Sequence, residues 1–287
     1  MYYFLLVLVT ATASFKALIC KRLGTDGSGV RRLLLLNSVI FLVATLPVLV
    51  AVLADGGFYL SKYSLGYALI YGGTLVFTQL CQIRAMRYGT TSMTTLVYSA
   101  GFLIPIVFAY FAFGEDISAV QLIGVSVLLC AVYLMVNPSG GFSVRWLLFA
   151  LLAMCGSGAT AVVQKIHQRS EFAGELPAFL VVVFLTAATI CFAAHFFLPR
   201  VEVCARSGGA TSALFPVVSG LCIGFLNLIN LTLAGKLPSV IQFPIYNVGS
   251  MILTGVLGAI LFKEKNSRIE IIGFGLGCVA ILLIGLF

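Results

Sequence analysis

Ten long stretches without a charged residue run through this sequence, and they limit its fold more than any other feature. Nine of the stretches reach 17 residues, and the first, 1–15, continues past Lys16 with four more uncharged residues. A helix that crosses a bilayer needs about 20 mostly apolar residues, and a lysine near its end can extend its ammonium to the interface. The sequence therefore predicts ten transmembrane helices, over 1–15 (extended to about 20), 33–54, 63–83, 88–114, 117–144, 146–164, 176–199, 207–235, 237–262 and 271–287.

The composition excludes the other large classes of protein. A soluble domain carries about 25% charged residues, whereas only 9% of these 287 residues are charged and 61% are hydrophobic. A membrane β-barrel would show short segments of alternating polarity, but these apolar runs are continuous. The net charge of +8 is scattered through short loops, which is typical of residues that orient a membrane protein. We expect an all-α, multi-pass protein of the cell (inner or plasma) membrane, with the lipid bilayer as a partner and no nucleic acid.

Cysteine and histidine give no sign of a metal or catalytic site. None of the eight cysteines forms a C-x-x-C pair, and His167 and His195 are the only histidines. We therefore expect no metal, no cofactor, no catalytic residue and no enzymatic activity. The alternative of a lipid-handling enzyme would rest on His167 and Glu171, which have helical spacing but are expected in a loop without a nucleophile.

The two halves of the chain resemble each other. Sliding 113–136 by 149 positions onto 262–285 aligns seven identical residues, among them a Phe-x-Glu-x-x-Ser pattern and an Ile-Gly pair. The segment 137–141, Asn-Pro-Ser-Gly-Gly, marks the midpoint. We expect two five-helix repeats, over 1–137 and 144–287. Because five is an odd number, the second repeat would be inverted in the membrane, a plan common among transporters.

Several of these residues also resemble a known family, the drug/metabolite transporter superfamily and its EamA-like members. The matching residues are Lys16, Arg87-Tyr88, Gly114-Glu115, Leu122-Ile123-Gly124, Glu264 and Ile272-Gly273. The resemblance implies two five-helix units over essentially the whole chain and the transport of small solutes. The sequence departs from the family pattern at Lys263, where the family usually has glycine, and at Pro105, about one turn late.

Polar residues inside the predicted spans indicate a solute-binding cavity. A polar group in hydrocarbon without a partner costs several kcal/mol, so these side chains face protein or a wet cavity lined by the first four and the sixth to ninth spans. Hydrogen bonding between packed helices is the alternative for each. Pro244 removes one helical N–H, which predicts either a break that frees carbonyls or a plain kink. The candidate substrate-binding residues are Lys16, Gln82, Arg87, Tyr98, Gln164, Asn227, Gln242, Tyr246 and Asn247.

The ionisable residues favour one class of solute. No Asp or Glu lies well inside a span, whereas Lys16, Arg84, Arg87 and Lys165 lie near span ends. Basic residues there suit a carboxylate or phosphate, so we expect a secondary transporter of a small polar, anionic or zwitterionic metabolite that works by alternating access. A multidrug or cation exporter of the same fold and a non-transporting membrane sensor remain alternatives.

Three further expectations concern loops, packing and orientation. Glu115 and Glu264 would cap or salt-bridge a helix start. The small-residue pair Gly273 and Gly277 marks either a homodimer face or a contact with the 117–144 span. Lys and Arg number thirteen after odd spans and four after even spans, which places both termini outside, whereas the family resemblance places them in the cytoplasm.

Overall fold

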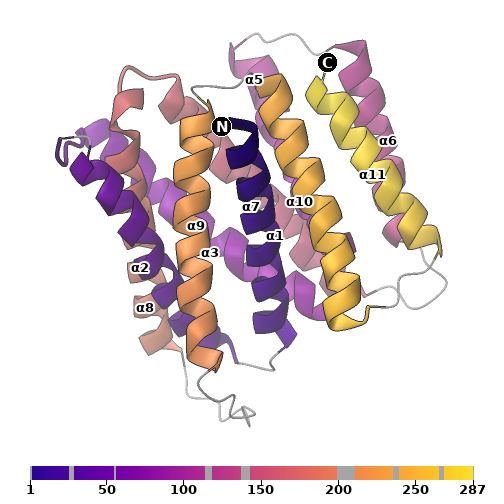
Figure 1. The fold of residues 1–287 in the computed structure, drawn as a ribbon, viewed down its shortest axis with the longest axis horizontal. Helices are drawn as coiled ribbons and strands as arrows, with labels where there is room; N and C mark the ends of the chain where they lie inside the picture. Colours follow the sequence, from indigo (N-terminus) through magenta and orange to yellow (C-terminus); the bar gives the residue numbers. More distant parts are fainter. Residues whose placement is uncertain are drawn as a thin grey trace.

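The structure, a computed structural model, describes residues 2–25, 29–54, 56–113, 118–136, 143–198, 211–234, 239–264 and 268–286. This part of the chain is helical and contains no strand (Figure 1). The helices are α1 (Tyr2–Thr25), α2 (Val30–Ala54), α3 (Lys62–Tyr88), α4 (Thr91–Ser99), η1 (Ala100–Phe102), α5 (Leu103–Phe113), α6 (Ala119–Val136), α7 (Val144–Gln168), η2 (Ala173–Glu175), α8 (Leu176–Phe197), α9 (Thr211–Ala234), α10 (Ser239–Phe262) and α11 (Arg268–Leu286).

Hydroxyl side chains fix where three of the helices begin. Ser61, Thr90 and Ser143 precede α3, α4 and α7, and each accepts a hydrogen bond from the backbone N–H three residues later. Such caps satisfy one of the free N–H groups at a helix start. A 3₁₀ turn interrupts the predicted 88–114 helix at η1, next to Pro105, which has no N–H to donate to the preceding turn. In contrast, α10 continues through Pro244, so the break that this proline allowed is not found.

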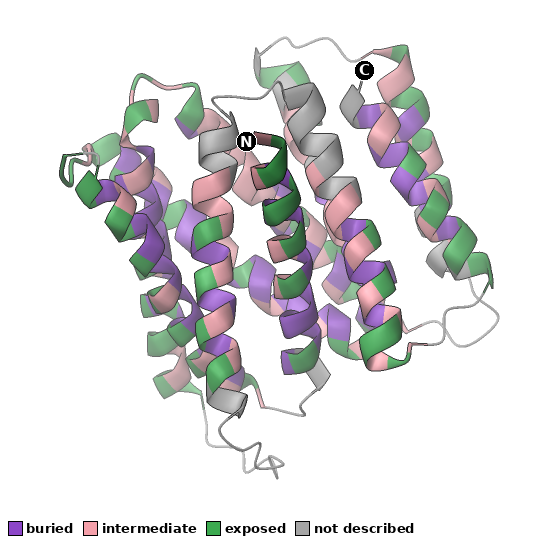
Figure 2. Cartoon of the chain, viewed as in Figure 1, coloured by how far each residue is buried: buried purple, intermediate pink, exposed green. Residues whose placement is uncertain are grey.

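The two halves of the chain pack against each other rather than forming separate bodies. Helix α2 lies against α8 and α9, α3 against α7 and α8, and α6 against α11. Helix α1 contacts α9, α10 and α3, while α4 contacts α10 and α7 (Figure 1). One apolar core joins α1, α2, α3, α8 and α9, and a second joins α4, α6, α7, α10 and α11. Figure 2 shows buried residues concentrated between the helices.

Glycines let two of these helix pairs approach closely. A Cβ at Gly72 of α3 would lie 2.8 Å from the Cβ of Thr186 on α8. A Cβ at Gly156 of α7 would collide with the hydroxyl of Thr78 on α3. Gly277 of α11 faces Leu96 of α4 in the same way, so this glycine packs inside the chain. Helix α11 also packs against α6, and the homodimer stays a prediction.

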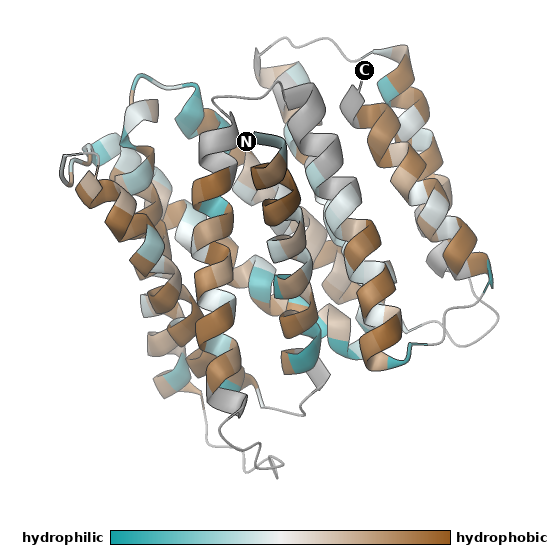
Figure 3. Ribbon diagram, in the orientation of Figure 1, coloured by the Kyte–Doolittle hydropathy of each residue, from teal (hydrophilic) through white to brown (hydrophobic). Residues whose placement is uncertain are grey.

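The outer surface is apolar and matches a membrane. Phe197 and Phe111 are 88% and 79% exposed, and brown, hydrophobic residues recur along the helices in Figure 3. Within the described residues, five helical segments are long and apolar enough to cross a bilayer: Tyr2–Leu23, Val30–Ala54, Thr91–Ala112, Val144–Gln168 and Ala173–Phe197. Shorter apolar helices cover Ala119–Ala131, Leu214–Ile229, Gly249–Phe262 and Ile271–Ile284. Helix α3 is about 40 Å long at 1.5 Å per residue but is more polar than these.

Candidate functional site

Two of the predicted site residues meet between α1 and α3. The ammonium of Lys16 donates a hydrogen bond to Oε1 of Gln82 at 3.3 Å. Gln82 is 3% exposed and Lys16 is half-buried. Among the described residues, Lys16 bonds to this amide oxygen, which carries no negative charge. The site therefore contains a positive charge that the described residues leave uncompensated.

A second polar contact extends this group toward the end of α1. The amide of Gln79 donates to Sγ of Cys20 at 3.6 Å, and both side chains are buried. Lys16 and Cys20 are four residues apart on α1, whereas Gln79 and Gln82 are three apart on α3, so each pair shares one helix face. Gln79 was not among the predicted site residues. Its spacing from Gln82 is the signal that would have found it.

Helices α4 and α10 border the same region. Tyr98 of α4 is half-buried, and α4 contacts both α1 and α3. On the other face of α1, the hydroxyl of Ser14 donates to the backbone oxygen of Ser250 on α10 at 3.0 Å. Tyr246 lies one turn before Ser250 and is half-buried. The helices that carry Gln82, Tyr98 and Tyr246 thus all contact α1, the helix that carries Lys16.

The other predicted residues are less closely joined to this group. Arg87 is exposed in the last turn of α3, and Gln164 is half-buried on α7. The Asn227 amide donates to the Ile223 oxygen one turn earlier at 2.8 Å, a bond within its own helix. The side chains of Gln242 and Asn247 lie outside the described residues. For these five the site role stays a prediction.

A buried ion pair lies one turn from this group, at the end of α1. Lys21 Nζ is 2.9 Å from Glu264 Oε1, and the side chains are 10% and 7% exposed. Glu264 also accepts hydrogen bonds from the N–H and hydroxyl of Thr91, while Lys21 donates to the Gly89 oxygen at 2.7 Å. The prediction that Glu264 caps a helix start and forms a salt bridge is confirmed. Glu115 lies outside the described residues. The sequence analysis did not single out Lys21, because a lysine at the end of a span is common.

His167 occupies a different place from the one expected. It lies in the last turn of α7, not in a loop, and it is fully buried. Its Nε2 is 2.9 Å from the hydroxyl of Ser64, and its ring stacks on Phe179 with centroids 4.2 Å apart. Glu171, its suggested partner, is exposed. These contacts tie α3, α7 and α8 together, so packing accounts for this histidine.

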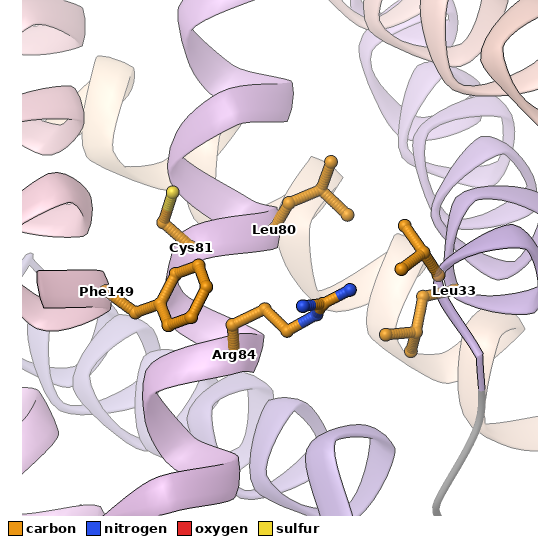
Figure 4. A pocket seen from close by; sticks show the side chains of 6 residues that line it. Leu33, Leu80, Cys81, Arg84 and Phe149 are labelled. Atoms are coloured by element: carbon orange, nitrogen blue, oxygen red, sulfur yellow. The ribbon is translucent and has the colours of Figure 1, made fainter. Parts of the chain in front are cut away.

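A small cavity of about 220 Å³ lies between α2, α3 and α7 (Figure 4). Arg84 of α3 extends into it, with the guanidinium carbon 5.8 Å from the ring centre of Phe149 on α7. The remaining wall is apolar and consists of Val30, Leu33, Leu80 and Cys81.

Comparisons with known proteins give the fold but no family. No family model matches the chain. An uncharacterized protein of Haemophilus influenzae is 28% identical over 182 residues, which cover 59% of this chain and 58% of that protein. The matched segment thus spans less than two thirds of the relative's length. A protein of known crystal structure superposes with a TM-score of 0.64 at 18% identity, covering 97% of this chain and 95% of its own. At that identity the likeness concerns the fold alone.

Proposed function

We propose that this chain is a secondary transporter of a small anionic or zwitterionic solute in the cell membrane. In this proposal ten membrane-spanning segments form two inverted five-helix repeats, as the EamA-like resemblance of the sequence suggests. The repeats rock about a central site, which opens to each side in turn. The half-buried ammonium of Lys16, held by the neutral amide of Gln82, is the observation that carries the proposal.

The pattern of helix contacts supports the repeat. If α4 and α5 count as one segment, the first half has the segments α1, α2, α3, α4–α5 and α6. Their counterparts in the second half are, in the same order, α7, α8, α9, α10 and α11. Exchanging counterparts turns the contact of α3 with α7 into that of α1 with α9, and the contact of α3 with α8 into that of α2 with α9. The contact of α4 with α7 likewise becomes that of α1 with α10. The contacts of α2 with α8, of α6 with α11 and of α4 with α10 map onto themselves. A two-fold axis in the membrane plane accounts for all of these pairs.

The chemistry at Lys16 supports the solute class. A charge in a poorly hydrated site is stable only when it is paired, and the described residues offer Lys16 an amide oxygen but no carboxylate. A solute with a carboxylate or phosphate would complete the pair by a charge-assisted hydrogen bond. Tyr98 on α4 and Tyr246 on α10, two helices that pack against α1, are proposed to hydrogen-bond its remaining polar groups.

Solute flux into proteoliposomes tests the proposal. The wild-type chain would be compared with Lys16→Met and with Lys62→Met, a control at the exposed start of α3. We expect uptake or exchange of one anionic or zwitterionic class, with roughly ten- to hundredfold weaker apparent affinity in Lys16→Met and no change in Lys62→Met. Flux that Lys16→Met leaves intact would reject the site and keep the transporter. The absence of flux for every class, with folded and inserted protein, would reject transport.

A further inference from the structure

The Arg84 cavity combines an apolar wall with one basic side chain. Five apolar or weakly polar side chains form most of its wall, and one guanidinium enters it (Figure 4). The figure shows this guanidinium pointing from α3 toward Leu33 of α2, with the Phe149 ring beside the stem of Arg84. The cavity is separate from the Lys16–Gln82 pair, which lies on the α1 face of α3.

Arg84 lacks a hydrogen-bond acceptor among the described residues. The ring of Phe149 offers it a cation–π contact, which uses the face of the guanidinium and none of its five N–H donors. A half-buried guanidinium that bonds to no described acceptor favours an anion, and its planar fork binds a phosphate or carboxylate through two parallel hydrogen bonds. The site therefore selects for negative charge.

The depth of the cavity narrows the choice of anion. Arg84 precedes the last residue of α3 by four positions, Leu33 follows the first residue of α2 by three, and Phe149 follows the first residue of α7 by five. At 1.5 Å per residue, all three lie about 5–8 Å inside the same end of the bundle. In a chain that crosses the membrane, this is the depth at which lipid headgroups meet the hydrocarbon.

The charge around the cavity agrees with that depth. Arg31 and Arg32 lie in the first turn of α2, directly beside the lining residues Val30 and Leu33. Basic residues at one end of a membrane protein attract anionic lipids, at about 1 kcal/mol for each Lys or Arg near the surface. A free inorganic anion would bind the guanidinium but would not contact the apolar wall.

We infer that this cavity binds an anionic phospholipid, with the headgroup phosphate on the Arg84 guanidinium and the first carbons of an acyl chain against Leu33, Leu80 and Phe149. The inference rests on the proposed crossing of the membrane but not on transport. The bound lipid would fill the space lined by α2, α3 and α7 and would hold this end of the bundle together.

Trp146 provides a local reporter for the experiment. It is the single tryptophan of the chain and lies three residues before Phe149 on α7. A phosphatidylglycerol with brominated acyl chains would be titrated into the purified full-length protein in detergent, and quenching of Trp146 fluorescence would be followed. Brominated phosphatidylcholine and unlabelled phosphatidylglycerol serve as comparison and competitor, and inorganic phosphate tests a free anion as the ligand. The variants are Arg84→Gln and, as a matched control, Arg145→Gln, which removes an exposed arginine at the same end.

We expect saturable quenching by phosphatidylglycerol that phosphatidylcholine does not match and that unlabelled phosphatidylglycerol reverses. Arg84→Gln should weaken it roughly ten- to hundredfold, as loss of a bidentate charged pair does, and Arg145→Gln by no more than about fivefold, the effect of one basic residue near the surface. Equal quenching by both lipids, or an unchanged affinity in Arg84→Gln, would overturn the inference. Competition by millimolar inorganic phosphate would identify a free anion as the ligand and overturn it as well.

Two features keep the result decisive. The comparison of lipids uses the wild-type chain, so it holds even if Arg84→Gln does not fold. Binding is measured without solute, so lipid binding in a chain that shows no flux would uphold this inference while the transport proposal fails.

Discussion

Lys263 is the described non-glycine residue with a left-handed backbone, with φ at +52°. It follows the last residue of α10 and directly precedes Glu264. A residue just past a helix end often takes this conformation, and glycine is usual there because a Cβ is crowded against the following carbonyl. The turn at Lys263 is thus associated with the placement of Glu264 beside Thr91 and Lys21. The glycine that the EamA-like pattern usually has at this position would fit the same turn without strain.

Replacing Lys263 by glycine should therefore stabilise the protein. The relief of the left-handed strain, offset by the greater freedom of glycine in the unfolded chain, gives about 0.5–1 kcal/mol. The free energy of unfolding in one detergent, or the midpoint of thermal unfolding, would measure it. Lys263→Ala is the matched control, since it removes the same exposed side chain but keeps the Cβ. An equal gain in Lys263→Ala would show that the backbone strain is not the cause.

At the scale of elements, one ion pair holds four helix ends together. Lys21 belongs to the last turns of α1, and Glu264 follows α10. The carboxylate of Glu264 accepts bonds from Thr91 at the start of α4, and Lys21 donates to Gly89 after α3. Removing one partner from a buried pair costs more than removing both, because a single charge is left without compensation.

We expect Lys21→Met and Glu264→Gln each to lower the free energy of unfolding by about 3 kcal/mol. The double variant should lose clearly less than the sum, since the two residues interact directly. Thermal or denaturant unfolding of the four proteins in detergent gives the cycle. Glu171→Gln, at an exposed carboxylate, is the control and should stay within about 0.5 kcal/mol. Strictly additive losses would mean that the pair contributes no coupling.

The sequence predicts where helices cross an apolar layer better than where they end. The span predicted to stop at residue 83 continues as α3 to Tyr88, because arginine is a good helix former and a charge marks the edge of the apolar layer, not of the backbone hydrogen bonding. The interruption at η1 also escaped prediction. Lys16 and Gln82 could each be proposed from sequence, but their pairing across 66 residues depends on how α1 packs on α3. Gln79 could have been proposed from its spacing to Gln82, whereas the role of Lys21 needed the structure for the same reason.

At the scale of the whole molecule, the charges are distributed unequally between the two ends of the bundle. Helix α1 begins and α11 ends at the same end (Figure 1). The opposite end contains the ends of α1, α3 and α10 and the starts of α2, α4 and α7. Lys21, Arg31, Arg32 and Arg84 are among the residues there. The described basic residues at this end belong to the thirteen that the sequence assigns to odd loops, against four in even loops. A bias of this size predicts a cytoplasmic location for the end that carries it.

Reporter fusions at the two termini should accordingly give the same sidedness, and we expect the non-cytoplasmic side for both. A fluorescent protein that matures in the cytoplasm and a phosphatase that is active outside would be fused in turn to each end, with a fusion after Phe262 as the internal control, expected on the opposite side. Termini on opposite sides would mean an odd number of crossings and would refute the ten-span arrangement. Two cytoplasmic termini would keep the ten spans, agree with the EamA-like resemblance, and place the Arg84 cavity in the outer leaflet, where its anionic lipid would have to be supplied.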